Sequence, residues 1–167
     1  SSLFALEAML TIRGVNSERV IPIADYYLGP GQVSLQPGEL LTLITVRAAS
    51  YQGYGGCYLK YAMRQAMDIA TLGTAVLVKP LPDKRHIETL RLAFGVAAPT
   101  PLRAHTTEAA LSGVTLAQAE AEIAALVQAE INPRTSWRAS REFRLQIAGE
   151  NAKRALKQAF IAAGGEA

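Results

Sequence analysis

Two apolar runs joined by a short connector decide the fold, Leu72–Val78 (LGTAVLV) and Ile87–Phe94 (IETLRLAF). Both runs are rich in apolar and β-branched residues and have the length of β-strands. The segment between them begins with Pro80–Lys84 (PLPDK), a connector of hairpin length. A third run of strand character, Cys57–Met63, precedes them. We therefore expect a three-stranded antiparallel sheet in the middle of the chain.

Two helices are predicted after the sheet. Thr115 and Gln118 have the spacing of a capping box, and apolar residues then recur at helical spacing to about Ala129. Ser140 can cap a second helix with an apolar stripe, and Gly164–Gly165 can end it. The fold class predicted for residues 50–167 is α+β, with a three-stranded antiparallel sheet covered by helices on one face.

The first part of the chain has the pattern of strands and loops. Alternating apolar residues predict a strand over residues 6–13, and turn residues 14–17 lead to a second strand over 19–23. Residues 26–38 contain many glycines and prolines and are expected to be loop. Residues 39–46 are apolar on both faces, which is typical of a covered strand.

A change of composition places a domain boundary near residue 50. Residues 48–56 contain three glycines and no charged residue. The stretch Gly53–Gly56 looks like a phosphate loop, but a strand follows it, whereas a phosphate site needs a helix N-terminus. We interpret it as a flexible linker between residues 1–49 and residues 50–167.

Composition excludes several classes of protein. The chain has 167 residues, half of them apolar, and its net charge of +3 is spread too thinly to indicate nucleic-acid binding. The longest apolar stretch without charge, Ile69–Val78, is about half the roughly 20 residues that a membrane-spanning helix needs. The lone Cys57 rules out an internal disulfide and favours the cytoplasm. Residues 1–7 carry no export signal and start within an apolar segment, so we expect a fragment of a longer protein.

Residues with catalytic or metal-binding chemistry are scarce. His86 and His105 lack a nearby nucleophile or a metal-ligand spacing, and we expect both at the surface. No catalytic residue and no metal ligand is therefore predicted. The six tyrosines have rings that can stack on a base or a flavin, but packing is their more common role.

The segment Lys60–Ile69 (KYAMRQAMDI) stands out from this background. By itself it can be a solvated cluster in which Arg64 and Asp68 pair. Together with other blocks, however, it resembles the FAD-binding subunit of bacterial xanthine dehydrogenase and related molybdenum hydroxylases. The blocks occur in the family's order: Gly29–Gly31, Pro37–Leu41, Leu59–Arg64, Ala66–Ile69, Leu90–Pro101 and Ser136–Arg144.

This resemblance implies both architecture and function. Residues 1–49 would be the C-terminal, β-rich tail of an FAD-binding domain, and residues 50–167 the flavoprotein C-terminal domain. The subunit would pass electrons from iron–sulfur clusters through FAD to NAD, in purine metabolism if the substrate is xanthine. The molybdenum cofactor and the 2Fe-2S clusters would belong to two partner subunits. Because the glycine-rich pyrophosphate loops of the family lie upstream of this chain, the isolated chain is expected to be inactive.

The resemblance also implies two cofactor-binding residues. Leu41 matches a leucine that packs against the flavin ring, and Lys60 matches a lysine whose charge lies at the flavin's pyrimidine side. The segment Arg64–Asp68 matches a loop beside the flavin that influences access of the nicotinamide acceptor. An alternative interpretation is a non-catalytic domain that docks partner subunits through its arginine-rich segment, Arg134–Arg144.

Overall fold

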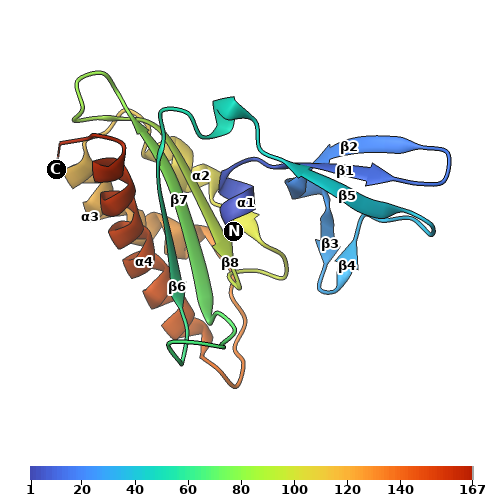
Figure 1. Ribbon diagram of the computed structural model, residues 1–167. Helices are drawn as coiled ribbons and strands as arrows, with labels where there is room; N and C mark the ends of the chain where they lie inside the picture. Colours follow the sequence, from blue (N-terminus) through green and yellow to red (C-terminus); the bar gives the residue numbers. More distant parts are fainter. Residues whose placement is uncertain (167) are drawn as a thin grey trace.

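The computed structural model describes residues 1–166 and has two parts (Figure 1). Ala167, the last residue of the expected second domain, lies outside the described residues. The first part contains α1 (Ser2–Ala5), β1 (Met9–Arg13), β2 (Glu18–Pro22), β3 (Tyr27–Gly29), β4 (Gln32–Val33), β5 (Leu40–Thr45) and the 3-10 turns Ile23–Asp25 and Ala48–Ser50. The second contains β6 (Gly55–Tyr61), β7 (Leu72–Pro80), β8 (Ile87–Gly95), β9 (Leu102–Arg103), α2 (His105–Ala110), α3 (Leu116–Glu130) and α4 (Arg141–Ala162).

The central sheet has the strand order β6-β7-β8-β9, with every neighbouring pair antiparallel. Its three long strands confirm the prediction from the sequence. The fourth, β9, has only two residues, which pair with Ala93 and Phe94 of β8. The α+β architecture is therefore confirmed, with one short strand added at the edge.

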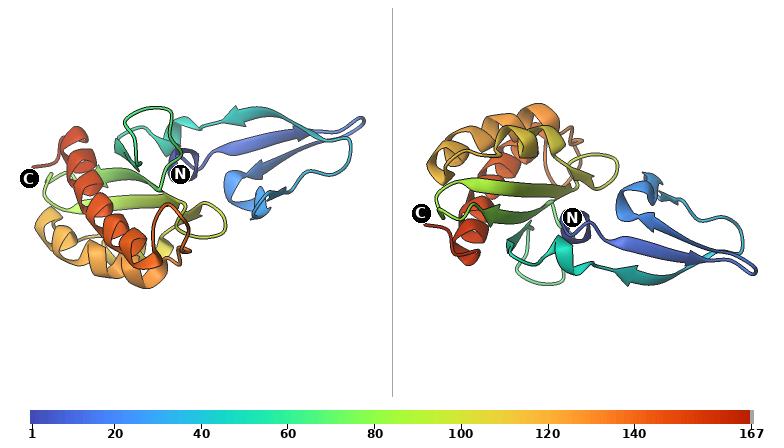
Figure 2. Two further views of the ribbon diagram at one scale, coloured as in Figure 1. Left: turned by 90° about the horizontal axis from the view of Figure 1, so that it is seen from below. Right: turned by 90° about the horizontal axis from the view of Figure 1, so that it is seen from above.

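Helices α3 and α4 cover one face of this sheet (Figure 2). Side chains alternate along a strand, so Val76 and Val78 of β7 and Leu92 of β8 point into the core beneath the helices. The predicted caps are present: Thr115 and Gln118 form the capping box of α3, and Ser140 Oγ accepts a hydrogen bond from the Phe143 N–H. Within residues 1–166, no helix is both long and apolar enough to cross a lipid bilayer.

The other face of the sheet packs against the first part of the chain. There the sheet presents Ala75 of β7 and Ala93 of β8, both buried, against Phe4 and Ala5 of α1. Small side chains at these positions let the helix approach the sheet closely. The three-stranded sheet β2-β1-β5 extends away from this contact, which makes the molecule elongated (Figures 1 and 2).

A charged network joins the two parts. Arg91 Nη2 lies 3.0 Å from Glu7 Oε2, and Arg91 Nη1 donates to the Ser50 carbonyl oxygen at 2.9 Å. The other oxygen of Glu7 accepts from Arg103 at 2.7 Å, and Arg103 also pairs with the buried Glu108. Because these groups are largely removed from water, each charge depends on its partners.

Three predictions for the first part are wrong in detail. The strand predicted over residues 6–13 begins only at Met9, because Glu7 has a positive φ of 50° and residues 2–5 form α1. The expected loop 26–38 contains the short hairpin β3–β4. The strand β5 is not covered on both faces: Leu41 packs against the core, whereas Leu40 on the other face of this edge strand is 70% exposed.

Gly55 and Gly56 are strand residues and not part of a flexible linker. Both lie in β6, where Gly55 is buried and pairs with Val78. A Cβ atom at Gly55 would overlap the carbonyl oxygen of Ala159 and the backbone nitrogen of Ala163. The glycine is thus needed because α4 packs directly on the backbone of β6.

We predict that Gly55→Ala lowers the free energy of unfolding by about 1–3 kcal/mol or more, because α4 has to move away from the sheet. Gly95→Ala is the matched control, since a Cβ at Gly95 meets no atom within 4 Å. That control should change stability by no more than about 0.5 kcal/mol. Urea denaturation of both variants measures the difference, and equal stabilities would show that α4 does not constrain Gly55.

The domain boundary near residue 50 stays a prediction. The larger core consists only of residues from Cys57 onward, which favours a separate unit for residues 50–167. Tyr51 is half exposed in the turn between the two parts. We expect chymotrypsin to cut first at Tyr51 and to leave a stable C-terminal fragment, identified by mass spectrometry. A first cut inside α3 would contradict the boundary.

Candidate functional site

Lys60 lies near the end of β6, on the face of the sheet that is turned away from α4. Its neighbours in the strand show this orientation, because Cys57 contacts Gln158 of α4 and the Tyr61 ring packs edge-on against Phe143. Lys60 is exposed, and its Nζ donates a hydrogen bond to the Asp68 carbonyl oxygen at 2.5 Å. The ammonium is therefore held at the start of the loop that follows β6.

This loop, residues 62–71, is organised by the Asp68 carboxylate. Asp68 Oδ2 accepts hydrogen bonds from the N–H groups of Met63 and Arg64 at 2.7 and 2.9 Å. Although desolvation acts in the opposite direction, these bonds lower the pKa of Asp68 below its usual value. Arg64 donates to the Met67 carbonyl oxygen and not to Asp68, so the side-chain pair considered from the sequence does not form.

Leu41 lies on β5, where it is opposite Ile12 of β1. It is half-buried and packs against the apolar cluster that contains Phe4 and Ile23. Leu41 and Lys60 therefore belong to two different sheets, and the structure does not assemble them into one cluster within this chain. Leu41 packs against the cluster that contains α1, and Lys60 lies on the face of the central sheet against which α1 packs.

A cavity of about 230 Å³ lies between β6, the strand that carries Lys60, and the start of the chain; neither Lys60 nor Leu41 lines it. Tyr58, two residues before Lys60 on the same strand face, lines it from the central sheet. Phe4, Ile23 and Tyr27 line it from the first part of the chain. The cavity is thus bordered by aromatic rings, with an ammonium group further along the same strand. Reasoning from the sequence treated the tyrosines as packing residues and did not find this arrangement.

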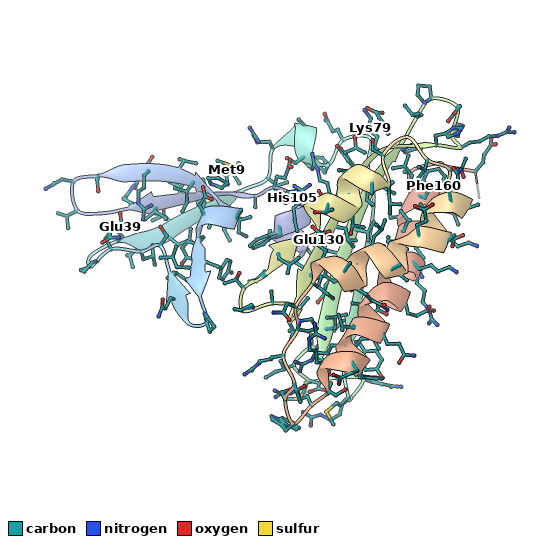
Figure 3. All side chains as sticks on the ribbon, turned by 180° about the vertical axis from the view of Figure 1, so that it is seen from behind. Met9, Glu39, Lys79, His105, Glu130 and Phe160 are labelled. Atoms are coloured by element: carbon teal, nitrogen blue, oxygen red, sulfur yellow. The ribbon has the colours of Figure 1, made fainter. Side chains whose placement is uncertain are left out.

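A larger cavity of about 630 Å³ lies between the first part and the β9–α2 segment. Its polar lining includes Glu7, Arg47, Arg103 and His105, and His105 lies at the start of α2 (Figure 3). The His105 side chain is 73% exposed, which confirms its predicted place at the surface. Since Glu7 and Arg103 pair with each other, this cavity presents mostly neutralised charges.

The two histidines are each placed beside a single carboxylate. His105 Nδ1 lies 3.2 Å from Glu108 Oε2, and His86 Nδ1 lies 2.6 Å from Asp83 Oδ2. Neither pair includes a serine or cysteine nucleophile within residues 1–166. Among the described residues, each histidine therefore has a carboxylate partner and no nucleophile beside it.

An ion pair fixes the turn that leads into β5 and Leu41. Glu39 accepts two hydrogen bonds from the Arg19 guanidinium, at 3.0 and 2.8 Å, and one from the Gln36 N–H. The bonds from Arg19, followed by that from Gln36, lower the pKa of Glu39 to about 2. Arg19 also donates to the Ser34 carbonyl oxygen, so the pair joins β2 to the 34–39 turn.

We predict that the stabilisation from Glu39 is present above its unfolded pKa of about 4.5 and is lost as the pH falls toward 2, because folding lowers this pKa. Carboxyl titration followed by NMR should show Glu39 protonating well below the usual range of a glutamate side chain. Glu39→Gln should remove this low transition and flatten the acid side of the stability curve. A Glu39 pKa near 4.5 in the folded chain would contradict the ion pair.

Comparisons with known proteins identify the family. The family described as CO dehydrogenase flavoprotein C-terminal domain matches residues 57–159. The chain is 39% identical over 161 residues to a xanthine dehydrogenase FAD-binding subunit of Escherichia coli O157:H7, covering 96% of this chain and 54% of the relative. It is 31% identical over 155 residues to the carbon monoxide dehydrogenase medium chain of Afipia carboxidovorans, covering 92% and 52%.

The fold agrees with this assignment. A structure of reconstituted CO dehydrogenase from Oligotropha carboxidovorans matches with a TM-score of 0.85 and 28% identity, over 96% of this chain and 55% of that one. The chain thus spans about half the length of the curated relatives it matches. On the family match over most of its length, this chain belongs to the CO dehydrogenase flavoprotein C-terminal domain family.

Proposed function

We propose that this chain is part of the FAD-binding subunit of a xanthine dehydrogenase-like molybdenum hydroxylase, and that the subunit passes electrons from iron–sulfur clusters through FAD to NAD. The observation that carries this proposal is the position of Lys60, exposed on the strand face that also lines an aromatic cavity. Relatives with the names FAD-binding subunit and medium chain match nearly all of the chain, which supports the same function.

The residues around the smaller cavity fit the ring end of a flavin. Tyr27, Tyr58 and Phe4 offer aromatic and apolar surface, on which a flat ring can pack. Leu41 would add an apolar contact from β5. The pyrophosphate end requires other residues of the full subunit, because residues 1–166 contain no glycine-rich loop that leads directly into a long helix.

A bound flavin would supply the electron-transfer chemistry, and the side chains of this chain would tune and shield it. The Lys60 ammonium would favour negative charge at the adjacent ring edge, which raises the reduction potential. The Asp68 carbonyl oxygen holds this ammonium in place. The 62–71 loop would then border the opening through which a nicotinamide acceptor approaches.

The proposed partner subunits are those that would hold the iron–sulfur clusters and the molybdenum cofactor. A [2Fe–2S] cluster needs four ligands, usually cysteines, and this chain has one cysteine. We assign the clusters and the molybdenum cofactor to two partner subunits, with NAD as the final acceptor, because the relatives are named as the FAD-binding subunit and the medium chain of their enzymes. A purine substrate and a place in the cytoplasm are the corresponding proposals for the whole enzyme.

A second candidate function is docking of the partner subunits without direct contact with the cofactor. The arginine-rich segment Arg134–Arg144 and its exposed Trp137 favour this candidate. Flavin absorption bands in the spectrum of the purified complete subunit would favour the first candidate, and a colourless subunit would favour docking alone.

We predict that Lys60→Met lowers the flavin reduction potential of the complete subunit by roughly 20 to 60 mV. A charge-assisted contact is worth about 1–3 kcal/mol, and about 30 mV corresponds to 1.4 kcal/mol for a two-electron couple. Turnover with NAD should change, whereas substrate hydroxylation assayed with an acceptor that bypasses the flavin should not. Spectroelectrochemical titration of the 450 nm flavin band measures the potential.

Two further variants make this test specific. Lys60→Arg keeps the charge and should restore most of the potential, while Lys153→Met removes an exposed charge from α4 and should leave the potential unchanged. If Lys60→Met leaves the potential where it was, or if both activities fall together, Lys60 has only a structural role.

A further inference from the structure

Exposed apolar side chains gather at one end of the molecule. There the 62–71 loop after β6 and the 132–140 loop before α4 both lie at the bottom of Figure 1, and next to them the rings of Tyr61 in β6 and Phe143 in α4 lie 5.6 Å apart. The most exposed members are Met67, 93%, and Trp137, 77%. We call this surface the Trp137 patch; its apolar members are Tyr61, Met63, Met67, Ile69, Trp137 and Phe143.

The same end carries a concentration of positive charge. Residues 60–69 and 132–144 contain six basic and two acidic side chains, against eleven and twelve in the rest of the chain. This end alone therefore has a net charge of +4, and the remainder has −1. Within residues 1–166, none of the six basic groups pairs with a carboxylate, whereas seven of the other eleven do. Five of these basic groups are exposed or partly exposed and the sixth, Arg144, is buried, and all six are left without a carboxylate partner in the described part of the chain.

A buried arginine holds the 132–140 loop in shape. Arg144 is only 2% exposed, and its guanidinium donates to the Arg134 carbonyl oxygen at 2.5 Å and to Ser136 Oγ at 2.7 Å. Its Nε has no hydrogen-bond partner. Burial, together with the nearby charges of Arg134 and Arg138, lowers the pKa of Arg144.

Burying the Arg144 cation without a carboxylate partner lowers the free energy of unfolding. The contacts that hold the 132–140 loop in shape therefore reduce the stability of the fold as a whole. These hydrogen bonds hold the backbone on which the Trp137 side chain stands. The Arg138 guanidinium stacks over the Trp137 ring at 4.2 Å, which further restricts both side chains. Rigid exposed Trp, Tyr and Arg side chains are the residue types that contribute most to binding energy in protein interfaces.

The shape of the patch favours a macromolecule over a small ligand. Met67 and Trp137 project into solvent, whereas small-molecule sites are concave and enclose their ligand. Apolar and aromatic side chains interspersed with arginines are typical of protein interfaces. A second copy of this chain is a poor complement, because the rest of its surface is nearly neutral.

We propose that the Trp137 patch docks a carboxylate-rich protein surface on another subunit of the complex. The identity of this partner as a subunit rests on the proposed function. Its facing surface would place carboxylates opposite Arg134, Arg138 and Arg141 and an apolar area opposite Trp137. Tyr61 directly follows Lys60 but points to the opposite face of β6, so the docked subunit would lie at the same end of β6 as the proposed flavin edge, across the strand from the Lys60 side chain.

The test compares two charge reversals of equal size. Arg134→Glu with Arg141→Glu alters exposed residues of the patch, and Lys153→Glu with Lys157→Glu alters exposed, unpaired residues of α4. Both are made in the complete subunit, and binding to the purified molybdenum and iron–sulfur subunits is measured by biolayer interferometry. The patch reversal should weaken binding by at least about 30-fold, the α4 reversal by less than about threefold.

Trp137→Ala is an independent arm, because it removes the ring and keeps the charge. It should weaken binding by about tenfold or more. Equal effects of the patch and α4 reversals, or wild-type affinity in all patch variants, would overturn the proposal. So would loss of duplex DNA binding in the patch variants while affinity for the subunits stays unchanged.

The flavin content separates this proposal from the proposed function. Patch variants that keep the 450 nm band and the wild-type potential, yet fail to bind the partner subunits, support docking. A wild-type subunit that holds flavin but binds neither partner overturns docking and leaves flavin binding intact. A wild-type subunit that binds the partners but never holds flavin contradicts the proposed function alone.

Discussion

The guanidinium of Arg91 is the group on which the arrangement of the two parts depends. It projects from β8 on the face opposite α3 and α4, where it meets Glu7 and the Ser50 carbonyl oxygen. These contacts come from both ends of the first part, just after α1 and just before β6. The Tyr54 ring also lies under the guanidinium, at 4.6 Å. One buried cation thus fixes where the chain enters and leaves the β2-β1-β5 lobe, and with it the cavity that Tyr27 and Tyr58 line.

The central sheet is covered on both faces because small residues stand where other elements approach it. Ala75 and Ala93 leave space for α1 on one face, and Gly55 leaves space for α4 on the other. Larger side chains at these positions would move both layers outward. The strand β6 is therefore held firmly at its Gly55 end, while its Lys60 end runs out into an exposed loop.

Lys60 stands between two surfaces with different proposed roles. On one side, Tyr58 and the aromatic cavity would receive the ring of the cofactor. On the other, the 62–71 loop joins Trp137 and the arginines in the proposed docking patch. The hydrogen bond from Lys60 to the Asp68 carbonyl oxygen links the two, since Asp68 also organises that loop. Docking of a subunit on the patch would in this way act on a residue next to the flavin.

The sequence by itself determined those strands and helices that depend on residues close together along the chain. The apolar and β-branched runs Leu72–Val78 and Ile87–Phe94 predicted the sheet, and the caps at Thr115 and Ser140 predicted the two long helices, because each signal depends on residues a few positions apart. The ordered motif blocks gave the family. Helix α2 was missed because its Ala104 N-cap offers no side-chain bond; the Glu130 carboxylate of α3 binds its first N–H groups instead (Figure 3).

Only the tertiary structure decided the features that join distant segments. Gly55 looked like a linker residue until α4 was placed against it, and Glu7 looked like an exposed strand residue until it met Arg91. The contact between the Tyr61 and Phe143 rings likewise cannot be seen in the local sequence, because it joins β6 to α4, which lie far apart along the chain. The roles of Leu41 and Lys60 remain predictions from resemblance. Local propensity reports on neighbours along the chain, whereas these contacts are set by how the sheet and helices pack.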